Sequence, residues 1–273
     1  GKQMQFFGAR VNAAKALLYA INGGRDEVSG KQVVEGYEPI KGDGPLDFDE
    51  VWQKYEEMLD WVVGTYVEAL NIIHYSHDKY AYEAVEMALH DSNIVRSMGC
   101  GIAGLSIVAD SLAAIKYAKV TPVRDETGLI TDYITEGEFP FYGNDDDRAD
   151  DIAATIVHTV MEKIKAIPMY RNAIPTQSVL TITSNVVYGK ATGAFPSGHK
   201  AGTPFSPGAN PENGADSHGM VASMLSVGKL DYKDALDGIS LTNTITPSGL
   251  GRTPEERINN LVGVLDAGFI MEK

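Results

Sequence analysis

Apolar residues near the start of the chain are separated by three or four positions. They are Met4, Phe7, Val11, Ala14, Leu18 and Ile21. This spacing predicts one amphipathic helix over residues 4–21, with a single buried stripe. The tripeptide Asn22-Gly23-Gly24 predicts the end of that helix, because asparagine and glycine commonly follow a last helical turn.

A second, longer helix is predicted over residues 49–80, with Asp47 or Asp49 as its N-cap. Its predicted buried side carries Trp52, Tyr55, Leu59, Val62, Tyr66, Leu70 and Ile73. The helical pattern continues over residues 81–90, and residues 102–119 predict another, mostly buried helix.

Shorter elements are predicted in the second half of the chain. Residues 120–144 carry extended signals, and five aspartates between positions 145 and 151 precede apolar residues at helical spacing. A helix is predicted there, because negative charge is favourable at a helix start. Residues 178–188 are rich in β-branched side chains and fit a strand or a helix equally well. Beyond position 219 we predict a helix over 220–227, a strand over 238–246 and a helix over 253–269.

Between these elements, residues 189–219 hold seven glycines and four prolines and predict a long loop. Loops of this length inside a compact domain are usually functional or disordered. The aromatic and small apolar residues within it favour an ordered loop that wraps around another part of the molecule.

Composition excludes several classes of protein. The 273 residues are 44% hydrophobic, and a net charge of −14 disfavours binding to nucleic acid or to an anionic membrane surface. The longest nearly uncharged apolar stretch, residues 98–109, is far shorter than the ~20 residues of a membrane span. A single cysteine, Cys100, excludes an internal disulfide and a cysteine-based zinc site. We therefore expect a cytoplasmic protein without a signal peptide, and the abrupt start suggests a chain cut from something longer.

Arg10 is the most informative single residue. On the predicted first helix its guanidinium projects into the apolar stripe, between Leu17 and Ile21 and close to Phe6 and Phe7. A guanidinium does not lose its proton in a protein, so it needs an anionic partner there. Two interpretations remain open: a structural ion pair with an acidic side chain, or a fork for the carboxylate or phosphate of a substrate.

Other candidate motifs are weaker. Residues 99–104 match the G-x-G-x-x-G string of dinucleotide-binding folds, but residues 90–98 do not resemble the apolar strand which that motif requires. We therefore expect tight backbone packing at a helix start, with Cys100 as an inert core residue. The pairs His74–His77 and Glu86–His90 have spacings that can hold a metal, but no four-ligand set is evident and no metal is predicted.

Several long blocks of the sequence resemble the pyruvate formate-lyase family of glycyl radical enzymes. They include GKQMQFFGARVNAAKALLYAINGG, ALNIIHYSHDKYAYEAVEMALHD, MGCGIAGLSIVADSLAAIKYAKV, RNAIPTQSVLTITSNVVYGK and DGISLTNTITPSGLG. The resemblance implies an α/β fold, as part of a ten-stranded barrel built from two five-stranded halves and surrounded by helices. By this resemblance, residues 1–273 are expected to form one portion of that barrel, without an internal domain boundary.

The resemblance also implies a function, that of a formate C-acetyltransferase. In this family a glycyl radical passes to a pair of adjacent cysteines, the thiyl radical attacks pyruvate, formate leaves and the acetyl group passes to coenzyme A. Family members are homodimers activated by a radical S-adenosylmethionine enzyme. The present sequence has neither a Cys-Cys dipeptide nor an Arg-Val-Ser-Gly-Tyr radical loop. We therefore expect an internal piece of the enzyme, with no catalytic residue of its own and inactive alone.

Three site residues follow from the resemblance. It implies that Arg10 pairs with the pyruvate carboxylate, that Phe7 lines the same pocket and that His90 stacks on the adenine of coenzyme A. The segment Pro196–Gly202 departs from the usual Pro-Asp-Gly-Arg-Arg-Ala-Gly of the family, because Ser197, His199 and Lys200 replace an acid and two arginines. Any salt link that this loop makes in relatives is therefore in doubt.

Two alternative functions remain open. A relative that prefers 2-ketobutyrate would use the same carboxylate clamp with a slightly larger pocket. A non-catalytic module that binds an anionic small molecule or a partner chain would leave apolar patches exposed on a truncated barrel.

Overall fold

The computed structural model describes residues 2–90, 92–181 and 183–270, and its centre is a five-stranded parallel sheet. The main order is β1 (Gln3–Phe6), β3 (Val95–Ala103), β6 (Ile174–Val179) and β7 (Gly238–Ile239). A short strand, β2 (Val11–Asn12), pairs with the end of β3. Helices cover the sheet, so the predicted α/β class is confirmed.

The predicted first helix over residues 4–21 is wrong in its first half. Residues 3–6 form β1, in which buried Met4 and Phe6 alternate with exposed side chains, and only α1 (Ala13–Ile21) is helical. β1 pairs in parallel with β3, which supplies backbone partners that a sequence pattern cannot reveal. The spacing of three and four resulted from a strand and a helix that meet across a turn. Arg10 therefore lies in the loop between β1 and β2 and not on a helix.

The predicted long helix is confirmed as α2 (Phe48–Asp78), and the Asp47 side chain caps it by accepting a hydrogen bond from the Glu50 amide. The buried residues of α2 are Val51, Tyr55, Met58, Leu59, Val63, Val67, Leu70 and His74. Ile73, predicted on the buried side, is exposed. After a left-handed Ala81 a separate short helix follows, α3 (Tyr82–Met87).

The glycine-rich stretch over residues 99–104 lies mostly within a strand, so the expected helix start there is wrong. Residues 98–103 of β3 are all buried, and a central parallel strand covered on both faces needs no alternation of apolar and polar residues. Gly104 has φ 85° and precedes α4 (Leu105–Tyr117), which therefore begins three residues later than predicted.

The remaining elements largely follow the sequence. β4 (Lys119–Arg124) and β5 (Ile130–Glu136) form an antiparallel hairpin, and Asp146 caps α5 (Asp147–Lys165). Residues 178–188, which fit a strand or a helix equally well, contain the end of β6 and most of α6 (Ser184–Lys190). Residues 191–219 form a loop with buried aromatic residues. The helices α7 (Met220–Gly228) and α8 (Pro254–Ile270) follow as predicted. The strand β7 is much shorter than the predicted strand over residues 238–246. Two short 3₁₀ turns are η1 (Tyr170–Asn172) and η2 (Pro247–Gly249).

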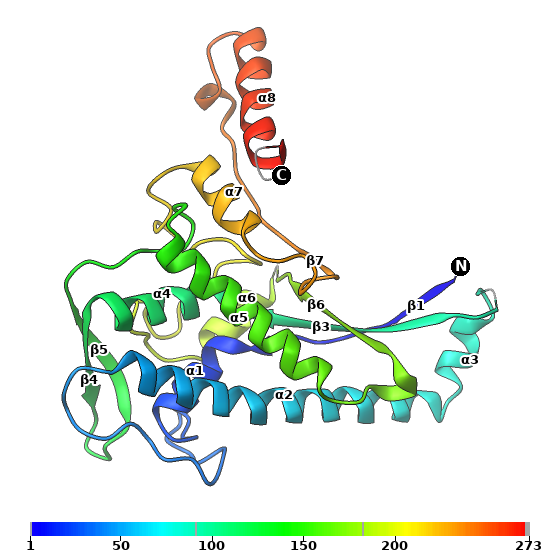
Figure 1. Ribbon diagram of the computed structural model, residues 1–273, viewed down its shortest axis with the longest axis horizontal. Coiled ribbons are helices and arrows are strands. Elements are labelled where there is room, and N and C mark those ends of the chain that lie inside the picture. The colour runs from blue at the N-terminus through cyan, green and yellow to red at the C-terminus, as the bar shows by residue number, and fades with distance from the viewer. Residues whose placement is uncertain (1, 91, 182, 271–273) are drawn as a thin grey trace.

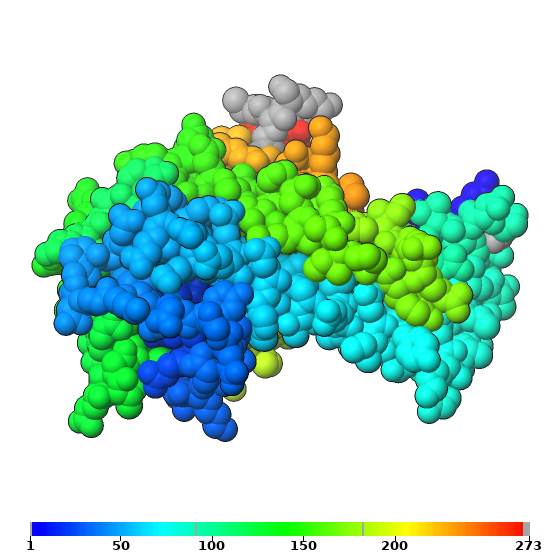
Figure 2. Space-filling view, turned by 60° about the horizontal axis from the view of Figure 1, so that its bottom comes forward, coloured from blue at the N-terminus to red at the C-terminus, as the bar shows by residue number. Residues whose placement is uncertain are grey.

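α2 runs along most of the molecule, with α5 packed beside it (Figures 1 and 2). The β4–β5 hairpin lies at one end of the molecule and α3 at the other, while α8 stands away from the main body (Figure 1). Among the described helices, none has the length and apolar character needed to cross a membrane.

Candidate functional site

A small cavity opens where β1 ends, beside the middle of β3. Its volume is about 120 Å³. It is lined by Gln5, Phe6, Phe7, Gly8, Ala9, Arg10, Gly99, Cys100, Ser178 and Asp237. The structure thus brings two of the predicted site residues, Phe7 and Arg10, to one cavity.

Arg10 is half-buried at this cavity, and its Nε atom is buried without a hydrogen-bond partner. No acidic side chain of residues 2–90, 92–181 or 183–270 forms an ion pair with it. The structural ion pair considered for Arg10 is therefore not formed in this part of the chain. A buried N–H donor without a partner is costly, and an anionic group in the cavity would satisfy it.

Two side chains of α2 hold the loop that carries Arg10. The Nε2 atom of His74 lies 2.7 Å from the carbonyl oxygen of Phe7, and the hydroxyl of Tyr66 donates to the carbonyl oxygen of Ala9 over 2.5 Å. Burial lowers the pKa of His74, so its ring is neutral near pH 7 and donates from Nε2. The Tyr66 hydroxyl also accepts a hydrogen bond from the Gly101 amide, 3.2 Å away.

The glycines around the cavity allow an unusually close approach of backbone segments. A Cβ atom on Gly8 would lie 1.2 Å from the carbonyl oxygen of Gly99, and one on Gly101 would lie 2.7 Å from the Ser178 hydroxyl. Any side chain at these positions would displace the loop or fill the space beside Arg10.

Phe7 borders the cavity, and its ring belongs to an aromatic cluster outside it. The ring centroid lies 4.7 Å from that of His74, 5.4 Å from that of His77 and 6.5 Å from that of Tyr82. About half of the Phe7 side chain, 46%, is exposed. This packing fixes the direction of the chain as it enters the turn toward Arg10.

Cys100 is buried in the wall of the same cavity, as expected. Burial raises the pKa of its thiol to about 11; a hydrogen bond with Tyr66 opposes the rise, and the negative field of Asp237 adds to it. Such a thiol stays protonated at neutral pH and is a poor nucleophile.

His90 lies in the turn between α3 and β3, half-buried, and does not line the cavity that contains Arg10. The same segment of the chain carries three exposed large side chains, those of Tyr80, Val85 and Leu89. His90 therefore belongs to a segment with exposed apolar side chains and does not share the cavity of Arg10.

Sequence reasoning missed several residues of the site. The helical pattern predicts only that Tyr66 lies on the buried side of its helix, and it gives no signal for Gln5 and Asp237, which form a hydrogen bond of 2.6 Å. Asp237 is 232 positions away from Gln5 in the sequence, so only parallel strand pairing brings it to the cavity.

The histidine pairs considered for a metal do not form a three-ligand group in the described residues. A different group does: ligand atoms of His158, Glu162 and Asp234 lie within 4.8 Å of one another. His158 and Glu162 are one helical turn apart on α5, and the His158 Nδ1 atom lies 2.7 Å from Asp234. Lys165 also lies close to both carboxylates of this group.

Comparisons with known proteins give a consistent result. Residues 1–189 match the family model described as Pyruvate formate lyase-like, and residues 205–273 match the one described as Glycine radical. The chain is 59% identical to Formate acetyltransferase 1 of Escherichia coli (strain K12) over 269 residues, which is 98% of this chain. It spans 35% of the length of that relative.

Two solved structures resemble the fold. A glycyl radical enzyme from Archaeoglobus fulgidus has a TM-score of 0.77 at 23% identity, covering 94% of this chain and 35% of its own. Hydroxyproline dehydratase from Clostridioides difficile, with trans-4-hydroxy-L-proline bound, has a TM-score of 0.80 at 22% identity. The match covers 99% of this chain and 37% of the dehydratase. At these identities the likeness concerns the fold alone.

Proposed function

The chain belongs to the pyruvate formate lyase-like family, and from this premise we propose that it forms part of the substrate pocket of a formate C-acetyltransferase. The whole reaction converts pyruvate and coenzyme A to acetyl-coenzyme A and formate. The observation that carries the proposal is the guanidinium of Arg10, whose buried Nε atom has no partner and which lines a small cavity.

Arg10 would bind the carboxylate of pyruvate. A planar guanidinium presents parallel N–H donors that match the two oxygens of a carboxylate. The cavity of about 120 Å³ suits a ligand of a few heavy atoms. Phe7 forms an apolar border on one side, and the hydrogen bonds from His74 and Tyr66 keep the loop in place before the ligand arrives.

The radical chemistry of this enzyme class would be carried by residues that do not line the cavity of Arg10. A glycyl radical supplies the one-electron chemistry when present, but Cys100 is the only cysteine in the sequence, and burial keeps its thiol protonated. The residues of this chain therefore bind and orient the substrate, and the isolated 273-residue chain is inactive in our proposal.

His90 would bind coenzyme A at a second place. Its half-buried imidazole lies in the same segment as exposed Val85 and Leu89, and a planar ring of this kind could stack on an adenine. We also propose the remaining properties of the family for the whole enzyme. These are a ten-stranded barrel that includes the five strands seen here, a homodimer, and activation by a radical S-adenosylmethionine enzyme.

A chimaera tests the proposed function. This chain replaces the matching segment of Formate acetyltransferase 1 of Escherichia coli, and the activated protein is assayed for acetyl-coenzyme A and formate. We expect pyruvate-dependent product from the chimaera and none from the isolated chain. A folded chimaera that is activated but forms no product would contradict the proposal. The ratio of kcat/KM for pyruvate and 2-ketobutyrate distinguishes the two keto acids.

A further inference from the structure

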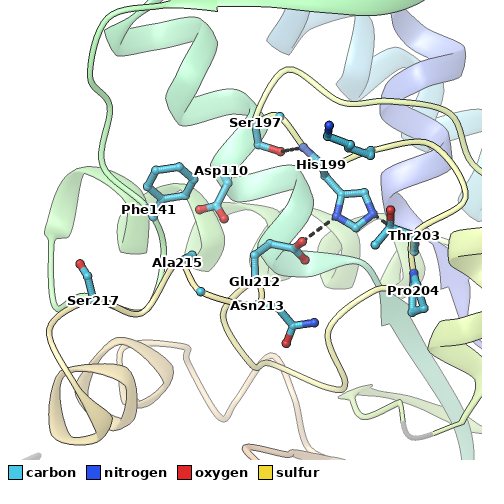
Figure 3. A pocket seen from close by; sticks show the side chains of 13 residues that line it. Asp110, Phe141, Ser197, His199, Thr203, Pro204, Glu212, Asn213, Ala215 and Ser217 are labelled. Atoms are coloured by element: carbon cyan, nitrogen blue, oxygen red, sulfur yellow. Dashed lines mark hydrogen bonds and ion pairs between the residues drawn. The ribbon is translucent and has the colours of Figure 1, made fainter.

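A second, larger cavity lies between α4 and the loop over residues 191–219, and the proposed function does not use it. Its volume is about 550 Å³, which is in the range of small-molecule sites. Figure 3 shows Asp110 from α4, Phe141 from the segment before α5, and His199 and Glu212 from the loop around it.

Asp110 provides the strongest indication of a ligand. Its side chain is fully buried, and its Oδ1 atom accepts a hydrogen bond of 2.7 Å from the Tyr142 amide. Its Oδ2 atom is buried without any partner. Buried carboxylate oxygens are nearly always hydrogen-bonded, so Oδ2 indicates a donor that is supplied from the cavity.

The imidazole of His199, which also lines the cavity, already has hydrogen-bond partners. The His199 Nδ1 atom lies 2.7 Å from Glu212, and its Nε2 atom lies 3.2 Å from the Thr203 carbonyl oxygen. The Ser106 hydroxyl donates to the other oxygen of Glu212. The His199 ring is therefore paired with Glu212 and forms no contact with Asp110.

The environment of Asp110 favours a positive charge. Burial raises the pKa of Asp110 well above its ordinary value, the negative fields of Glu212 and Asp150 add to that rise, and the Tyr142 amide opposes it. A cation beside Oδ2 would offset these effects and favour the ionised carboxylate. The Phe141 ring also lines the cavity, and aromatic faces attract cations. A neutral apolar ligand would leave Oδ2 of Asp110 without a hydrogen-bond partner.

We propose that this cavity binds a small guanidinium compound. The planar cation would donate to Oδ2 of Asp110 and lie against the ring of Phe141. A guanidinium suits the site better than a simple ammonium, because its donors are spread in a plane and can reach two acceptors together. This inference does not depend on the proposed acetyltransferase activity.

Lys200 is the rival occupant. It lines the cavity, its side chain is exposed, and it forms no ion pair with any residue that the structure describes. A flexible lysine could place its own ammonium beside Asp110, so the experiment must distinguish a bound compound from this side chain.

The test is a calorimetric titration of the 273-residue protein with methylguanidinium, with methylurea as a neutral compound of the same shape. We expect saturable binding of methylguanidinium and none of methylurea. Asp110→Asn keeps the acceptor for Tyr142 but removes the charge, and it should weaken binding by about tenfold or more. Phe141→Leu should weaken it by about threefold or more.

Three results would overturn the proposal. The first is equal binding of methylguanidinium and methylurea, or no binding of either. The second is an unchanged affinity of Asp110→Asn for methylguanidinium. If Asp110→Asn does not fold, an unchanged affinity of Phe141→Leu has the same meaning. The third is binding that occurs only in Lys200→Gln, which would make Lys200 the occupant. His199→Arg should abolish methylguanidinium binding, because its tethered guanidinium would take the place of the ligand.

Discussion

The hydroxyl of Tyr66 lies 2.5 Å from the carbonyl oxygen of Ala9, the residue immediately before Arg10. Because the same hydroxyl accepts a hydrogen bond from the Gly101 amide, one side chain joins α2, the loop and β3. Tyr66→Phe leaves both backbone groups without this partner, and we expect a loss of ~1–3 kcal/mol in the free energy of unfolding.

Urea denaturation measures this loss, and Tyr37→Phe is a matched control. Tyr37 donates to the Glu57 carbonyl at an exposed position, so its substitution should cost less than ~0.5 kcal/mol. Equal effects of the two substitutions would show that Tyr66 does not hold the loop.

The ion pair between Lys15 and Asp26 should make the free energy of unfolding depend on pH. Burial would raise the pKa of Asp26, but hydrogen bonds from Lys15 and Ser29 outweigh that effect and lower it from 3.8 to about 2. A carboxylate whose pKa is lowered on folding stabilises the folded state when the pH is above the pKa of that group in the unfolded chain. This contribution is lost as the pH falls from about 3.8 to about 2. It amounts to roughly 2 kcal/mol at neutral pH.

Lys15→Met should therefore be less stable than the unchanged protein at pH 7, and the difference should shrink between pH 5 and pH 2. Chemical denaturation at several pH values measures it. Lys15 also contacts Glu27 at 2.8 Å, so a part of the loss comes from that pair. A difference that stays constant over this range would contradict the assignment.

Cys100 should react slowly with alkylating agents in the folded protein. Its pKa of about 11 leaves little thiolate at pH 7.5, and its side chain is buried. We expect iodoacetamide to label the native protein at least ~100-fold more slowly than the urea-unfolded protein, as followed by mass spectrometry. Comparable rates would mean that Cys100 is accessible and activated.

His90→Ala should affect only the coenzyme A half of the proposed reaction. In the chimaera we expect KM for coenzyme A to rise by about threefold to tenfold, because one stacking surface is lost, while KM for pyruvate stays the same. Val85→Ala is a control for the exposed apolar surface alone. Equal loss with respect to both substrates would contradict an adenine contact.

The sequence predicted most helices of this fold and the Asp47 cap of α2, because amphipathic spacing and side-chain caps are local properties. It misassigned the segment before α1, since parallel pairing of β1 with β3 joins Gln3 to Val95 and leaves no local trace. The same reason explains β3, whose glycines resembled a helix start but lie in a fully covered strand.

The site shows the same division. The side-chain chemistry of Arg10, a guanidinium that must have an anionic partner, could be inferred without its secondary structure, although the helix assumed for it was wrong. Asp237 could not be inferred, because it reaches the cavity only through the sheet. Likewise, the pairing of His199 with Glu212 depends on how a long irregular loop folds back on itself.

The most direct test of the central claim is the pyruvate dependence of Arg10→Lys in the chimaera, with Arg25→Lys as a matched control away from the cavity. Lysine keeps the charge but loses the planar fork, so we predict a rise of about tenfold or more in KM for pyruvate and an unchanged KM for coenzyme A. Arg25→Lys should leave both unchanged. An unaltered KM for pyruvate in a folded Arg10→Lys enzyme would remove Arg10 from the substrate site and contradict this account.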